Sequence, residues 1–230
     1  IVARIGTIAA RLGLDPKKPK SIAEFGRSMH DFVTFKAGDT LDQKRLTSFN
    51  VLFNEDSGIR LTDTSSEDDI LNAKTYLVSK VMSVGAGKKA DWKNNVAARN
   101  VAVYLDAFEK TGILDLVLEH SAEYCVSKDK LNSFSTNPEL AQEKEKMLQT
   151  WDQKLRDKIY KKTGRDPSVV MQEIRQQIKN TIGPEASLED ALVFNSMIVT
   201  DFTGKLVMAA AVDDNVLKYV SEVMPKLYDG

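Results

Sequence analysis

The chain has 230 residues, which is enough for one large domain or two smaller ones around a substantial hydrophobic core. Hydrophobic residues make up 42% and charged residues 28%, a balance that is typical of a folded protein and excludes a disordered chain. The formal net charge of −1 excludes a strong overall field that would draw the chain to a nucleic acid or a membrane.

A single cysteine, Cys125, excludes a disulfide within the chain and fits a reducing compartment such as the cytoplasm. The longest uninterrupted apolar run, residues 206–212, is far shorter than the roughly 20 residues of a spanning helix. The sequence therefore predicts no membrane span.

Apolar residues recur at three- and four-residue spacing along most of the chain, which indicates amphipathic helices. Four helix starts have the sequence of a capping box, in which Ser or Thr is followed three residues later by an acid or amide. These pairs are Ser21 with Glu24, Thr40 with Gln43, Ser66 with Asp69 and Ser187 with Asp190. No alternating strand pattern stands out, so the sequence predicts an all-α fold of about ten helices.

Two predicted helices organise the rest of the chain. Residues 91–110 are apolar around most of the helix surface, which is typical of a central, buried helix. Residues 137–164 form the longest predicted helix, with acids at its start, bases at its end and Gly164 as a left-handed stop. Its apolar stripe cannot bury itself, so other helices must pack on it. Near the C-terminus, Gly204 is expected to interrupt a helix that starts after Ser187.

The chain is expected to divide into two helical lobes. The polar segment 128–137 is the expected boundary, which gives an N-terminal lobe of residues 1–130 and a C-terminal lobe of residues 131–230. Residues 1–20, which end in a proline-rich hinge, and residues 213–230 are expected to be terminal arms.

No local motif of catalysis or cofactor binding is complete. In VGAGKK, residues 84–89, the spacing of Gly and hydroxyl residues around Lys88 does not match a phosphate loop. In GRSMH, residues 26–30, His30 stands where a nucleophile elbow needs Gly. With only His30, His120 and Cys125, a zinc tetrad of the usual ligands cannot be built. The sequence predicts no cofactor, no metal and no enzyme activity.

Two groups of basic residues suit single-stranded RNA, because phosphates would meet the cations and a base would stack on the indole. The first group is Lys88, Lys89, Trp92, Lys93 and Arg99. The second group, at the end of the long predicted helix, is Lys158, Lys161, Lys162 and Arg165. Each group also has a simpler interpretation, as a solvated loop or as a favourable partner of the helix dipole. Only the fold can bring both groups onto one surface.

Three functions stay open on the sequence alone. The favoured one is a non-enzymatic structural or assembly protein that acts through self-association as a homo-oligomer. The alternative is a nucleocapsid or coat protein of a virion that polymerises along single-stranded RNA through a basic surface between the lobes. The third is an enzyme whose site is spread over several helices, which would need a pocket with convergent titratable groups.

Overall fold

The computed structural model describes residues 2–12, 28, 30–37, 40–84, 91–120 and 141–224. Within its helices, the side chains at 141, 143–145, 147–148, 189–190 and 192–201 are not described. The predictions for several residues therefore lie outside the described part: those for Lys88, Lys89, Cys125, the Ser21 cap and the boundary at 128–137.

The described residues are almost entirely helical, which confirms the all-α prediction. The helices in chain order are α1 Val2–Leu12, α3 Gln43–Ser57, α4 Glu67–Met82, α5 Val96–Lys110, α7 Ala141–Thr163, α8 Pro167–Thr181, α9 Leu188–Val212 and α10 Asp214–Val223. Residues 30–33 and 114–120 are helical as well. The strands seen in this part are the two-residue β1 Lys36–Ala37 and β2 Thr40–Leu41, which pair antiparallel.

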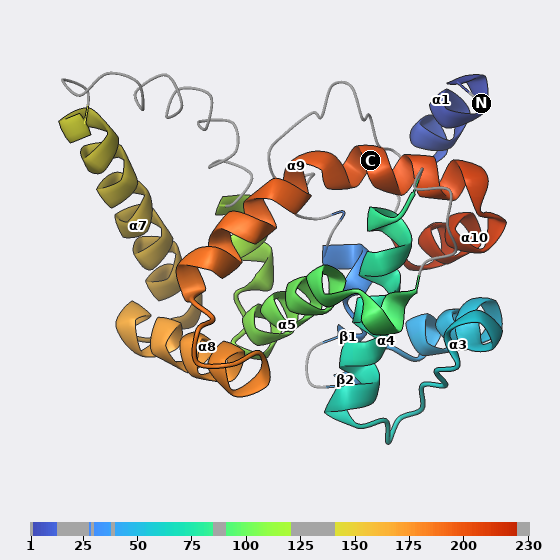
Figure 1. The fold of residues 1–230 in the computed structure, drawn as a ribbon, viewed down its shortest axis with the longest axis horizontal. Helices are drawn as coiled ribbons and strands as arrows, with labels where there is room; N and C mark the ends of the chain where they lie inside the picture. Colours follow the sequence, from blue (N-terminus) through green and yellow to red (C-terminus); the bar gives the residue numbers. More distant parts are fainter. Residues whose placement is uncertain are drawn as a thin grey trace.

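Helix α9 crosses the molecule from α8 at one end to α1 and α10 at the other (Figure 1). The expected break at Gly204 is wrong, because α9 is continuous through it. A helical Gly costs about 1 kcal/mol relative to Ala, whereas each large apolar side chain that is buried contributes about 1.5–3 kcal/mol. Phe202, Leu206 and Val207 around the Gly are all buried, so packing overrides the local preference.

Helix α5 is the central helix that the composition predicts. Ala98, Val101 and Leu105 are fully buried, and α5 packs on α4, α8 and α9. It begins at Val96 rather than near residue 91, because the Asn95 side chain accepts a hydrogen bond from the Ala98 amide and caps the helix there. A short 3₁₀ turn, η1 Trp92–Asn94, precedes it.

Two capping predictions have opposite outcomes. The Ser66–Asp69 capping box is confirmed, with the Asp69 amide 3.1 Å from the Ser66 hydroxyl and the Ser66 amide 3.0 Å from the Asp69 carboxylate. The Thr40 box is wrong, because Thr40 lies in β2 and Asp42 caps α3 instead. A Thr fits a pleated strand, and an Asp next to the helix is the stronger cap.

Helix α7 matches the predicted long helix over the part that the structure describes. Leu155 and Ile159 are buried in the core and the helix packs on α8. Arg156 pairs with Asp152 at 2.8 Å, one turn before it. The predicted stop is confirmed, because Gly164 has a φ of 66° and its amide donates to the Tyr160 carbonyl at 2.8 Å.

Both terminal helices pack on the same chain. α1 buries Ile8, Ala9 and Leu12 against α9, and Arg4 pairs with Asp214 at 2.7 Å. α10 packs on α3 and α9. The division into lobes and arms stays a prediction. None of the described helices is long and apolar enough to cross a membrane.

An aromatic cluster joins three helices in the core. The Phe53 ring lies 5.7 Å from Phe49 on α3, 5.4 Å from Tyr76 on α4 and 5.5 Å from Tyr219 on α10. Tyr219 meets Phe32 edge-on at 5.7 Å. Since aromatic pairs add stabilisation beyond the area they bury, this cluster holds α10 onto α3 and α4.

Removal of the ring at the centre of this cluster is expected to be costly. Phe53→Ala should lower the free energy of unfolding by about 3–5 kcal/mol, because it leaves a cavity among aromatic side chains. Val51→Ala on the same helix is the matched control. Val51 is 76% exposed, so its loss should change the free energy by less than about 0.5 kcal/mol. Urea unfolding followed by circular dichroism measures both, and equal effects of the two variants would contradict this packing.

Candidate interaction surfaces

A shallow groove lies beside Trp92, one of the residues expected to contact RNA. It encloses about 510 Å³ between the end of α3 and the turn η1. Its lining residues are Glu55, Asp56, Ser57, Gly58, Asp91, Trp92 and Lys93. We call it the Trp92 groove.

The Trp92 groove is acidic, since three of its lining residues are carboxylates and one is a lysine. Glu55 and Asp91 are exposed. Asp56 already accepts the Tyr76 hydroxyl at 2.8 Å and pairs with Lys80 at 3.2 Å. Because carboxylates repel a phosphate, RNA contact at Trp92 and Lys93 stays a prediction that runs against the local charge.

The Trp92 indole contacts two side chains of the same protein molecule. Its ring meets Tyr76 edge-on with centroids 6.3 Å apart, and Lys93 Nζ lies 5.7 Å from its centroid. The lysine position indicates that this indole attracts an ammonium group. Burial, helped by the hydrogen bond to Asp56, raises the pKa of Tyr76 well above its ordinary value, so the hydroxyl stays protonated and keeps donating.

Arg99 lies apart from the groove lining, on the exposed side of α5. Its Nη1 is 3.5 Å from Asn72 Oδ1 on α4, which is the outer limit of a hydrogen bond. Contact of Arg99 with RNA stays a prediction.

The second basic group lies at the end of α7 and in the turn to α8, and its Lys162 and Arg165 are paired with carboxylates. Lys162 forms an ion pair with Asp115, and Arg165 pairs with Glu173 at 2.5 Å. Burial alone would raise the pKa of Asp115, but its pairing with Lys162 holds it below the usual range. Lys158 is half-buried and Lys161 is exposed.

A face of exposed lysines runs along α7, and the sequence analysis missed most of it. Lys146, Lys154 and Lys161 are all exposed, and so is Asp157 on the same side of the helix, one turn from Lys154 and from Lys161. The eight- and seven-residue spacing of the lysines places them within about 80° around the helix and about 22 Å along it. This spacing can be read from the sequence, but the sequence alone does not show which face of α7 packs against the rest of the protein. We call these three lysines the α7 lysine face.

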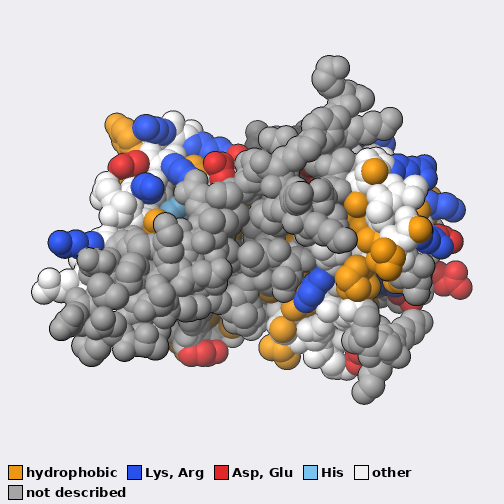
Figure 2. All heavy atoms as spheres, turned by 90° about the horizontal axis from the view of Figure 1, so that it is seen from above, with side chains coloured by type: hydrophobic (Ala, Val, Ile, Leu, Met, Phe, Trp, Pro, Cys, Tyr) orange, Lys and Arg blue, Asp and Glu red, His pale blue; other side chains and the backbone are white. Residues whose placement is uncertain are grey.

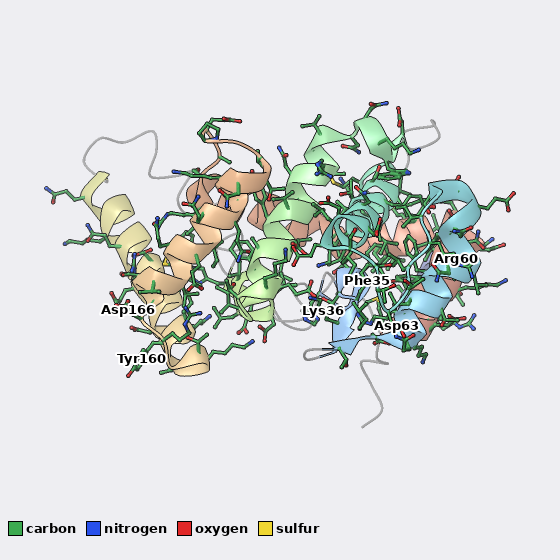
Figure 3. The ribbon with its side chains drawn as sticks, turned by 90° about the horizontal axis from the view of Figure 1, so that it is seen from below. Phe35, Lys36, Arg60, Asp63, Tyr160 and Asp166 are labelled. Carbon is green, nitrogen blue, oxygen red and sulfur yellow. The ribbon has the colours of Figure 1, made fainter. Side chains whose placement is uncertain are left out.

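The Trp92 groove and the α7 lysine face lie at opposite ends of the molecule. Figure 3 shows Arg60, two residues past the groove residue Gly58, at one end of the long axis and Tyr160 of α7 at the other. The ion pair between Lys162 and Asp115 agrees with this placement. It ties the end of α7 to the chain just after α5, whereas Trp92 lies just before α5. Since α5 has 15 residues, its two ends lie about 22 Å apart. Among the described residues, Trp92 and Lys93 therefore lie apart from the second basic group.

Figure 2 shows Lys and Arg side chains at both ends of the molecule and a gathering of hydrophobic side chains at the end that carries α1. Among the side chains that the structure describes on α1 and α9, the large exposed apolar ones are Val2, Met208 and Val212, at 80%, 43% and 69% exposure. Apolar side chains gathered on a surface are typical of contact with another molecule.

A network of ion pairs around the buried Lys74 joins α4 to α5 and was not foreseen from the sequence. Lys74 is only 1% exposed, and its Nζ lies 3.1 Å from Asp106 and also donates to Glu109. Lys110 lies 3.0 Å from both Asp106 and Glu67. Burial alone would raise the pKa of Asp106, but Lys74 and Lys110 hold it below the usual range.

A cavity of about 160 Å³ adjoins this network between α4, α5 and α8. It is the place where the hypothesis of a dispersed enzyme site would look for catalytic groups. Its titratable side chains are Asp106 and Lys110, and burial, which would lower the pKa of Lys110, is outweighed by Glu67 and Asp106, which raise it. Asp106 and Lys110 therefore both stay charged near neutral pH. General acid–base catalysis instead favours groups whose pKa lies near the working pH. The histidines lie elsewhere, His30 beside Asp31 and His120 edge-on to Trp151.

Among the residues that the structure describes, no group of three or more His, Cys, Asp or Glu is placed to hold a metal ion. No protein-family model, curated protein or solved structure matches the chain. The interpretation of its surfaces therefore depends on their geometry and charge.

Loss of the buried cation is expected to destabilise the protein strongly. Lys74→Met should lower the free energy of unfolding by about 3–5 kcal/mol, because Asp106 and Glu109 would face each other without their shared partner. Lys44→Met on α3, where the side chain is exposed, is the control and should change it by less than about 0.5 kcal/mol. Thermal or urea unfolding compares the two. A near-neutral Lys74→Met would contradict the network.

The Asp106 pairing should also appear in the pH dependence of stability. Because the folded pKa lies below the unfolded value of about 3.9, the pairing stabilises the fold above that pH. The stabilisation is lost as the pH falls through the folded pKa. The difference in free energy of unfolding between the parent chain and Asp106→Asn should be largest near neutral pH and should shrink below about pH 4. Asp157→Asn, at an exposed site, should give a smaller difference at neutral pH.

Proposed function

We propose that the chain is a non-enzymatic assembly protein that acts by self-association, with surfaces of opposite charge on successive copies in contact. The observation that carries the proposal is the distance between two local surfaces of opposite charge. An acidic groove lies at one end of the long axis and a face of exposed lysines at the other.

This separation favours contacts between copies over contacts within one copy. The two surfaces are held apart by the rigid, buried α5, so neither can neutralise the other in the same molecule. A contact between two different surfaces is heterologous, and it generates a ring if the rotation closes or an open filament if it does not. The exposed apolar side chains on α1 and α9 offer a second contact that would support such an assembly.

The expected contact is weak for each ion pair and sensitive to salt. Exposed ion pairs contribute about 0–1 kcal/mol each, and charges are screened beyond about 10 Å at 0.1 M salt. Assembly would therefore need several pairs and would appear most strongly at low ionic strength and high protein concentration.

A second candidate function is binding of single-stranded RNA in a nucleocapsid or coat. The α7 lysine face supports it, because three exposed cations along about 22 Å could follow a phosphate backbone. Its expected signature is affinity that falls steeply with salt. Unchanged RNA binding after Lys88, Lys89 and Lys93 are replaced by Ala would remove the first basic group from this candidate.

Self-association is tested by size-exclusion chromatography with light scattering, read at 260 and 280 nm. At about 0.05 M salt we expect a mass above the 25.6 kDa of one chain that rises with protein concentration and has a protein-like absorbance ratio. At about 0.5 M salt, the mass should fall toward one chain. Excess absorbance at 260 nm would favour the RNA candidate instead. A single chain under all conditions, free of nucleic acid, would contradict both.

A further inference from the structure

We infer that the Trp92 groove is the docking site for the α7 lysine face of a second copy, so that Lys154 and Lys161 of one copy approach Glu55 and Asp91 of the next. This inference rests on the proposed self-association and names the two surfaces that make the contact.

The groove has the chemistry to receive an ammonium group. Glu55 and Asp91 are exposed on its walls, and Asp91 accepts a hydrogen bond from the Asn94 side-chain amide at 2.6 Å. Asp56 is engaged by Tyr76 and Lys80. The Trp92 indole lines the same groove, and Lys93 Nζ of its own chain lies 5.7 Å from the ring centroid. Carboxylates beside an indole favour a cation through charge and through the ring quadrupole together.

The lysine face has the shape to enter such a groove. Lys154 and Lys161 are seven residues apart, which puts them about 10 Å apart on the same side of α7. They are exposed, unlike Leu155 and Ile159, which pack into the core. A convex, straight helix surface can therefore approach the open groove without disturbing the packing of α7 on α8.

The occupant is a second copy because the two surfaces complement each other in charge and lie at opposite ends of one chain. The groove carries three carboxylates against one lysine. Residues 152–165 contain six basic and two acidic residues. Lys162 and Arg165 are paired with Asp115 and Glu173, and Arg156 is paired with Asp152. The exposed Lys154 and Lys161 are the bases of this stretch that belong to the lysine face.

A pair of charge reversals tests the contact. The first variant, Lys154→Glu with Lys161→Glu, gives an acidic α7 and keeps an acidic groove. The second variant, Glu55→Lys with Asp91→Lys, gives a basic groove and keeps a basic α7. Each variant alone should associate at least about tenfold more weakly than the parent chain, since like charges would meet at every contact.

An equimolar mixture of the two variants should recover association, because every acidic surface then finds a basic one on the other variant. Sedimentation velocity at low salt measures all three samples. The control is Lys44→Glu with Lys218→Glu, at exposed positions on α3 and α10, which should associate like the parent chain. Circular dichroism melting of each variant shows whether it is folded.

The outcomes separate the contact from the proposed function. Association of both folded variants at the level of the parent chain would overturn the docking site and leave self-association standing. Weak association of each variant without recovery in the mixture would also overturn the pairing. A parent chain that does not associate would overturn both proposals. Loss of bound RNA from the α7 variant alone, with no change in protein association, would assign the lysine face to RNA.

Discussion

The burial of α5 is the constraint on which the arrangement of the molecule depends. The helix packs on α4, α8 and α9, and its Ala98, Val101 and Leu105 are closed off from solvent. The acidic groove precedes it and the α7–α8 end is tied to the residue Asp115 that follows it. A central helix of this kind behaves as a rigid rod, so it fixes the separation of the two charged surfaces.

Two further interactions secure the helices around α5. The buried Lys74 on α4 joins Asp106 and Glu109 on α5, which sets α4 and α5 in register. A buried ion pair of this kind contributes little net stability but is costly to break, so it favours one arrangement over others. The aromatic cluster around Phe53 then holds α10 against α3 and α4, and places the α9–α10 corner at the same end as the Trp92 groove.

The fold class and several helix ends could be predicted from the sequence because their causes are local. The Ser66–Asp69 capping box and the stop at Gly164 depend on residues a few positions apart, and both are as expected. The same local reasoning failed at Gly204, where burial of its helical neighbours outweighs the preference of one residue. Local reasoning also failed at Thr40. Both Thr40 and Asp42 are residue types that can cap a helix, but Thr40 is part of strand β2 and Asp42 is the residue that caps α3.

The candidate surfaces were harder to predict, since they depend on which residues become neighbours. Glu55 and Asp91 are 36 positions apart, and only the fold places both carboxylates in the groove that Trp92 lines. Lys162 and Arg165 appeared as part of a basic group in the sequence, but Asp115 and Glu173 neutralise them in the fold. Conversely, the spacing of Lys146 and Lys154 can be read from the sequence, but only the structure shows that both side chains are exposed to solvent.

Zero-length carbodiimide cross-linking tests the contact between copies most directly. Unlabelled and ¹⁵N-labelled chains are mixed at low salt, cross-linked and digested, and the mass of each linked peptide shows whether its halves come from different copies. The head-to-tail contact predicts mixed-label links that join Lys154 or Lys161 to Glu55 or Asp91. Links of Lys162 to Asp115 within one copy serve as the internal standard, because that pair is formed in the fold. If the standard appears and mixed-label links form only at other sites or not at all, the contact between the two charged surfaces is wrong.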